Sequence, residues 1–249
     1  MRRLFPLFLA ALLCGQAFSQ NTPTADEIIA KNIQARGGLN KLTGIKTLRT
    51  TYATEEDGKP VQLVELHKRP DKLRRNITFG KTSVIFAYDG QTAWQYFSSQ
   101  GKGPSPAPAD LAQELKEEAD IDGSLVNYKE KGSSVELAGK EKLNGKDVYN
   151  LKLTLKEGQT RNIYIDARNF LEVKETGSYQ QGGKKVDFTT LFKDYRPVQG
   201  TMFPYVIDQK TGDEENQITT LKKVELNVPI ADSVFSMSSV PSGSAKAHK

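Results

Sequence analysis

The chain has 249 residues, with 35 Lys and Arg against 30 Asp and Glu, a formal charge of +5 and a single cysteine, Cys14. Without Arg2 and Arg3, 33 basic residues stand against 30 acidic ones, an excess too small for a nucleic-acid-binding surface. One cysteine also excludes a disulfide-stapled scaffold, so an apolar core must hold the chain together.

Residues 1–19 have the pattern of an export signal. Two arginines precede an apolar run at 4–13, and residues 17–19 supply the small side chains that signal peptidase recognises. The run is shorter than the roughly 20 residues of a membrane-spanning helix. We therefore expect cleavage before Gln20 and export to the periplasm of a Gram-negative-type bacterium, with no transmembrane segment in the mature chain. A lipid-anchored form is not favoured, because a bulky leucine precedes Cys14.

The mature chain begins with a pattern typical of one helix. Thr24 and Glu27 have the spacing of a capping box. Apolar residues between 28 and 35 recur at helical spacing, and Gly37-Gly38 predicts the end of the helix.

From residue 46 onward the apolar period changes to two, which predicts strands. Tight-turn sequences such as Asp-Gly and Asn-Gly separate them, so successive strands should pair antiparallel. The predicted strands are 46–54, 61–69, 72–80, 83–88, 92–97, 135–143, 147–156, 159–166, 170–178, 184–195, 203–209 and 217–227.

One stretch interrupts the strands. Residues 101–108 are rich in glycine and proline and are not expected to pair in a sheet. After them, Leu111 and Leu115 form the apolar stripe of a helix, whose polar side carries Glu117 and Glu118, expected to be solvated. We interpret residues 98–130 as a helical insertion.

The predicted fold is mostly β (α+β). About 11–12 twisted strands tend to curl into a strongly curved antiparallel sheet, or unclosed β-barrel. Its concave face then needs a cover, which the N-terminal helix and the insertion, acting as a helical lid, would supply. We expect one domain over residues 20–239 and a disordered tail over 240–249.

Several segments together resemble the outer-membrane lipoprotein-sorting protein family, the periplasmic lipoprotein carrier LolA and its relatives. The segments are Ala25–Ala30, Gly37–Leu42, Tyr88–Trp94, Phe188–Asp208, Val224–Asn227 and Asp232–Phe235. The resemblance implies an unclosed barrel, a helical lid and a cavity between them for acyl chains. It also implies that an arginine on an early strand contacts the lid, and Arg49, Arg74 and Arg75 are the candidates.

The sequence offers little catalytic chemistry. The mature chain lacks cysteine and has two histidines, His67, interpreted as a surface residue, and His248. No Gly-x-Ser-x-Gly motif, zinc-ligand spacing or phosphate-binding glycine loop occurs. We predict a protein that is not an enzyme and that needs no metal or cofactor.

The remaining possibility is that the protein binds a ligand through apolar side chains. The residues predicted to line the cavity are Leu73, Ile77, Phe79, Ile85, Trp94, Tyr96, Tyr149, Leu151, Leu153, Val186 and Phe188, with Leu111 and Leu115 on the lid. Trp94 and Tyr96 are favoured, because each combines an apolar ring with a polar group. The alternative for every one of them is ordinary core packing.

Three functions are compatible with these patterns. The first is a monomeric periplasmic carrier of lipoprotein acyl chains or other lipids. The second is an envelope sensor or regulator that binds an exported segment of a membrane protein. The third, an esterase, is remote, since no catalytic constellation is visible.

Overall fold

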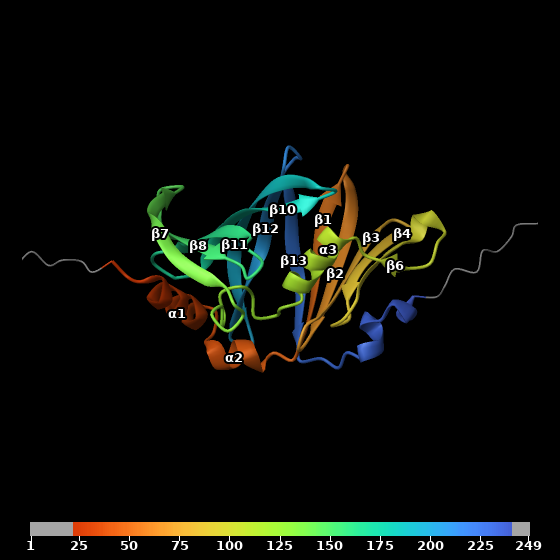
Figure 1. The fold of residues 1–249 in the computed structure, drawn as a ribbon, viewed down its shortest axis with the longest axis horizontal. Helices are drawn as coiled ribbons and strands as arrows, with labels where there is room; N and C mark the ends of the chain where they lie inside the picture. The colour runs from red at the N-terminus through yellow and green to blue at the C-terminus, as the bar shows by residue number, and fades with distance from the viewer. Residues whose placement is uncertain (1–21, 241–249) are drawn as a thin grey trace, which may run out of the picture.

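The structure is a computed structural model that describes residues 22–240. The predicted signal and residues 241–249 of the predicted tail lie outside the described residues. A single antiparallel sheet of 13 strands organises the fold (Figure 1). Its strands are β1 (Thr47–Glu56), β2 (Lys59–Lys68), β3 (Lys72–Phe79), β4 (Thr82–Tyr88), β5 (Ala93–Phe97), β6 (Ser105–Pro106), β7 (Ser134–Leu143), β8 (Lys146–Thr154), β9 (Thr160–Asp166), β10 (Glu172–Gln181), β11 (Lys184–Val198), β12 (Thr201–Thr211) and β13 (Gln217–Leu226).

The path of the chain explains the strand order. Strands β1 to β6 run from the centre of the sheet to one edge, and β7 to β13 run from the other edge back to the centre. The two halves join where β1 pairs with β13, with Leu48 opposite Leu226. Because β6 and β7 do not pair with each other, the curved sheet stays open. The predicted fold class is confirmed.

Strand β6 corrects one expectation. Ser105 and Pro106 pair with Gln95 and Trp94 of β5, although this stretch was not expected to pair. The strand lies at the edge of the sheet, where a proline is tolerated because its missing N–H leaves no ladder bond unmade.

Helix α1 (Ala25–Ala35) begins as predicted. The backbone N–H of Glu27 donates to the Thr24 hydroxyl at 3.2 Å, and the Thr24 N–H donates to the Glu27 carboxylate at 2.8 Å. Two backbone donors at the helix start are thereby satisfied.

Glycine at position 37 lets the end of α1 approach the turn between β11 and β12. A Cβ atom on Gly37 would lie 2.4 Å from the carbonyl oxygen of Gly200. The N–H of Met202 donates to the Arg36 carbonyl at 3.0 Å. Helix α2 (Leu39–Gly44) follows directly, so both helices are fixed at one end of the sheet.

Residues 107–133, here the crossing segment, connect the two edges of the sheet. They start after β6, form helix α3 (Ala109–Glu118), continue as turns and reach β7. In Figure 1, α3 is seen in front of β1 and β13, and the helix contacts β3 to β5 in one half of the sheet and β10 in the other. The sheet face that α3 covers is called the inner face below.

Two separate cores cover the inner face. One lies under α1 on β8 and β9 and contains Ile28, Leu151 and Ile163. The other lies under α3 on β3 to β5 and contains Leu73 and Leu115. The central strands lie between these two cores.

The outer face of β2 to β5 is covered by the C-terminal segment, residues 228–240. The short 3₁₀ helices of the fold are η1 (Ser98–Gln100) and, in this segment, η2 (Asp232–Phe235) and η3 (Met237–Ser239). The indole N–H of Trp94 donates to the Phe235 carbonyl at 2.7 Å. Val240 is buried against the same strand face, which corrects the expectation that the tail begins at 240.

Within residues 22–240, no helix combines the length and the apolar character that crossing a membrane requires.

Candidate functional site

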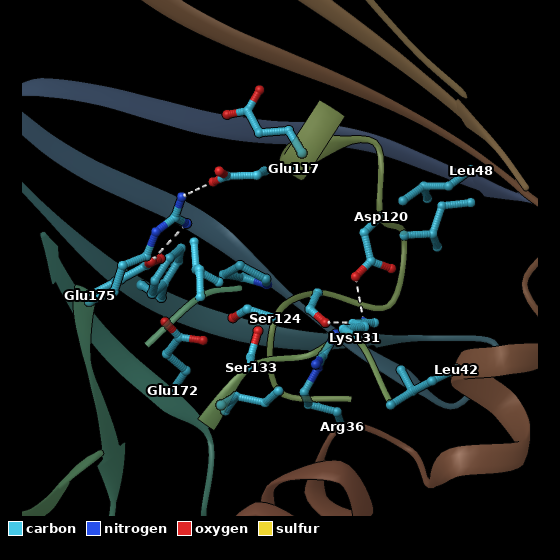
Figure 2. A pocket seen from close by; sticks show the side chains of 18 of the residues that line it. Arg36, Leu42, Leu48, Glu117, Asp120, Ser124, Lys131, Ser133, Glu172 and Glu175 are labelled. Carbon is cyan, nitrogen blue, oxygen red and sulfur yellow. Dashed lines mark hydrogen bonds and ion pairs between the residues drawn. The ribbon is translucent and has the colours of Figure 1, made fainter. Parts of the chain in front are cut away.

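A hollow of about 640 Å³ lies between the two inner-face cores, under the crossing segment (Figure 2). Here it is called the central hollow. Its lining comes from the ends of α1 and α2, from β1 and β9 to β12, and from the crossing segment. A second hollow of about 550 Å³ continues on the other side of Arg161 and shares Glu117 and Glu175 with the first.

One side of the central hollow is apolar. Its side chains lie on the central strands, on α2 and in the turns of the crossing segment. They are Leu42, Ile45, Leu48, Ile121, Leu125, Phe192, Tyr195, Met202 and Phe203. This surface can remove an aliphatic group from water.

Another part of the lining is charged, and Arg161 of β9 is the centre of its ion pairs. Arg161 donates to Glu117 of α3 at 2.8 Å and to Glu175 of β10 at 3.2 Å. Its side chain is 27% exposed and those of the two carboxylates are 20% and 18% exposed. Helix α3 is thus tied to the β9–β10 part of the sheet by a largely buried ionic bridge.

Arg75 of β3 forms the matching bridge on the other half of the sheet. It donates to Glu65 of β2 and to Glu118 of α3, each at 2.7 Å. Burial disfavours the charge on Glu65, but Arg75 and His67 outweigh that effect and lower its pKa to about 2. Of the three candidate arginines, Arg75 therefore contacts α3, whereas Arg74 donates to the Val234 carbonyl on the outer face and Arg49 pairs with Glu225.

The turns that follow α3 are fixed by further polar contacts. Arg69 donates to both carboxylate oxygens of Asp122 and to the backbone carbonyls of Ile45 and Leu42. Arg36 donates to the Asp122 carbonyl at 3.2 Å. The crossing segment is therefore held at the C-terminal end of α3 and in the turns that follow it, so its path over the hollow is defined.

Glu172 of β10 differs from the other carboxylates of the hollow. Figure 2 shows its side chain pointing into the open space beside Glu175. Among the described residues, no side chain forms an ion pair with it within 4.0 Å. Burial, together with the negative charge of Glu175, raises its pKa to about 8, against the opposing effect of Arg36 and Arg161.

This raised pKa predicts a pH dependence of stability. A carboxyl that titrates near 4.5 when unfolded and near 8 when folded binds its proton more tightly in the folded state, so the free energy of unfolding falls as pH rises through that window. Glu114, whose pKa burial raises to about 7, acts in the same direction. Urea unfolding at pH 5.5 and 8.5 should show a smaller difference for Glu172→Gln than for the unchanged chain. An equal difference in both proteins would contradict this assignment.

Several predicted cavity residues are solid core. Leu73, Leu151 and Leu153 are fully buried. Tyr149 packs against the core under α1, with its ring 6.2 Å from that of Phe170. The prediction that these four line the cavity is wrong, because α1 and α3 pack directly on them.

Three other predicted residues lie on the outer face. Ile85, Trp94 and Tyr96 pack with Met237 and Val240 of the C-terminal segment. The expectation that Trp94 and Tyr96 lie at the cavity rim is also wrong. The polar group of Trp94 serves instead to fix the C-terminal segment.

The remaining predicted residues lie on the inner face. Ile77 and Phe79 are half-buried. They share a face of β3 with Leu73, because they lie an even number of positions away from it, but they line neither hollow. Val186 lies opposite Tyr179, also outside both linings. Phe188 lines the second hollow, with Arg161 5.9 Å from its ring centre.

The lid residues form a packed helix face. Leu115 is fully buried, and Leu111 packs against the same core on β3 to β5. Glu117 and Glu118, expected to be solvated, are paired with Arg161 and Arg75. Both the apolar and the acidic residues of α3 thus hold this helix on the sheet.

His67 is another correction. Its side chain is only 13% exposed, with Nε2 4.0 Å from a Glu65 oxygen, so it is not a surface residue. Its Nδ1 atom has no hydrogen-bond partner among the described residues. Over residues 22–240, His, Cys, Asp and Glu side chains nowhere gather in a group of three or more suited to a metal ion.

Sequence reasoning missed most of the true lining. Met202 and Phe203 lie near the start of β12, shortly after the turn at Gly200, and Glu172 begins β10. No local sequence pattern indicated that Arg161 and Glu175 are largely buried, because charged and polar residues recur along both of their strands. Only the path of the crossing segment makes their face an interior one.

A family model described as an uncharacterized protein matches residues 89–241, more than half of the chain. The chain belongs to this family. No curated protein matches the sequence significantly.

Solved structures show what the fold is similar to. A DUF1329 family protein from Desulfovibrio piger matches with a TM-score of 0.55 at 14% identity, over 88% of this chain and 100% of that one. A LolA superfamily protein from Nitrosomonas europaea matches with a TM-score of 0.56 at 16% identity, over 86% and 98%. A putative outer membrane lipoprotein-sorting protein domain from Vibrio parahaemolyticus matches with a TM-score of 0.55 at 13% identity, over 86% of this chain and 96% of that one. The chain therefore shares the LolA-type fold.

Proposed function

We propose that this family member is an exported, non-catalytic carrier that binds an acyl chain of a lipoprotein or another lipid in the central hollow. The observation that carries the proposal is a hollow of about 640 Å³ with one apolar side beneath a helix-bearing crossing segment. This volume lies in the range of small-molecule sites, about 300–1,000 Å³. The LolA-type fold of the chain supports the same function, and the export signal favours a periplasmic location.

The energetics suit a carrier. Burying a 16-carbon chain would contribute on the order of 10 kcal/mol before ordering costs are subtracted. Ion pairs of Arg161, Arg75 and Arg69 hold the crossing segment, together with apolar contacts to both inner-face cores. A ligand could exchange these contacts for its own. Moderate net affinity follows, and moderate affinity permits release.

Native mass spectrometry of residues 20–249 with a palmitoylated lipopeptide tests this function. A 1:1 complex is expected with the lipopeptide and not with the same peptide lacking its acyl chain. Met202→Glu, which places a charge on the apolar side, should abolish the complex. The control Ile218→Glu, at an outer-face position that is 57% exposed, should retain it.

The alternatives give different results in the same experiment. Equal binding of the unacylated peptide would contradict the carrier function and favour the alternative, a sensor or regulator that binds an exported protein segment. Loss of the acyl mass during incubation would indicate an esterase. Trp94 emission should stay unchanged on binding, since that side chain lies on the outer face.

A further inference from the structure

The central hollow contains a carboxylate that the chain itself leaves without a partner. Glu172 faces the open space in Figure 2, and no dashed interaction joins it to a neighbour. A buried charge is normally paired, because leaving water costs several kcal/mol. A ligand of opposite charge could therefore supply Glu172 with the partner that the described residues do not provide.

The cations near Glu172 are already committed. Arg161 serves both Glu117 and Glu175. Arg36 donates to the Asp122 carbonyl, and Lys131 pairs with Asp120. Within residues 22–240, none of these three cations forms an ion pair with Glu172.

Glu172 also stands next to the apolar side. Phe192 and Tyr195 of β11 line the same hollow, as does Met202 of β12. A single bound molecule that fills this space would meet an aliphatic surface and a carboxylate together.

We propose that the hollow selects amphiphiles whose aliphatic chain ends in a positively charged nitrogen, with Glu172 as the group that binds this nitrogen. The inference rests on the proposed function, since it names the headgroup of the ligand that the carrier would hold. A charge-assisted hydrogen bond from an ammonium group would satisfy Glu172. The aliphatic part would lie against Phe192 and Met202.

The neighbours of Glu172 add a pH dependence to this selection. Glu175 on its own strand, Arg161 on β9, Arg36 after α1 and Tyr195 on β11 are the charged and titratable groups that face it. Burial and the negative charge of Glu175 raise the pKa of Glu172 to about 8, against the opposing effect of Arg36 and Arg161. An alkylammonium, with a pKa near that of lysine, stays charged through this range. Its binding should therefore tighten as pH rises from 6 to 8.5.

Calorimetric titration with three probes of equal chain length tests the proposal: dodecylammonium, dodecanoate and dodecyl maltoside, each below its micelle concentration. Dodecylammonium should bind at least about tenfold more tightly than dodecanoate, as expected for a hydrogen bond to a charged group. Glu172→Gln should remove most of this preference and its pH dependence. Binding of dodecyl maltoside should be unchanged. Glu136→Gln, at an exposed position of β7, is the matched control and should behave like the unchanged chain.

The outcomes separate the two proposals. If dodecanoate and dodecylammonium bind equally, or if Glu172→Gln keeps the preference, the headgroup inference is wrong and the carrier function stands. If none of the three probes binds, the proposed function itself fails.

Discussion

Replacing Arg161 with methionine is expected to lower the free energy of unfolding by about 3 kcal/mol, since it leaves two largely buried carboxylates without their cation. Glu117 and Glu175 would then face each other across α3 and β10 with no counter-charge between them. Urea unfolding monitored by circular dichroism measures the effect. The helix would also lose its bridge to this half of the sheet.

Lys152→Met is the matched control. Lys152 pairs with Glu136 at 2.8 Å, the same separation as Arg161 and Glu117, but its side chain is 46% exposed and that of Glu136 66%. An exposed pair contributes at most about 1 kcal/mol. Adding Glu117→Gln and Glu175→Gln to Arg161→Met should restore most of the lost stability. Equal losses for both single variants would mean that the bridge is an ordinary surface pair.

Leu151→Ala is expected to cost about 2–5 kcal/mol, because it opens a void in a core that is fully buried under α1. Alkyl binding per folded molecule should not change. Met202→Ala should give the opposite result, a smaller loss of stability with weaker alkyl binding, because Met202 lines the hollow. Paired measurements of unfolding and of dodecyl maltoside affinity provide the comparison. Weakened binding in Leu151→Ala with little loss of stability would show that the hollow extends to β8.

The features that the sequence predicted well are local ones. The capping box at Thr24 depends on two residues three apart, and its hydrogen bonds form as expected. Turns such as Asn144-Gly145 adopt positive φ angles that favour these residue types. Short turns between segments of alternating hydrophobicity force consecutive strands to pair. The sequence therefore predicted the meander on each side of the crossing segment correctly.

The faces of the strands were harder to assign. Ile85 and Trp94 are apolar residues of alternating strands, as Leu73 is, so the sequence pattern does not distinguish them. Yet Ile85 and Trp94 lie on the outer face and Leu73 lies on the inner face. The C-terminal segment covers the outer face, and nothing in the strand pattern signals a cover that comes from more than 130 residues away along the chain. Both faces of β4 and β5 therefore carry apolar side chains, and their patterns alone do not separate cavity from core.

The charged side of the hollow depends on long-range geometry. Arg161 and Glu117 are 44 positions apart, and they meet only because the crossing segment runs over β9 and β10. A glutamate on the polar side of a short helix is most often solvated. Glu117, with a side chain only 20% exposed, departs from this expectation, whereas Glu118 is 37% exposed and also pairs with Arg75. The candidate site is consequently more polar than an acyl-chain cavity inferred from apolar residues alone.

Methyl NMR of methionine tests the central claim most directly, because residues 20–249 contain two methionines on opposite faces of the sheet. Met202 lines the central hollow, and Met237 packs under the C-terminal segment. With ¹³C-methyl methionine and an alkyl ligand, the Met202 signal should shift and show nuclear Overhauser contacts to the chain, while the Met237 signal stays in place. Shifts at Met237 alone, or at neither methyl under saturating ligand, would contradict an acyl-binding hollow beneath the crossing segment.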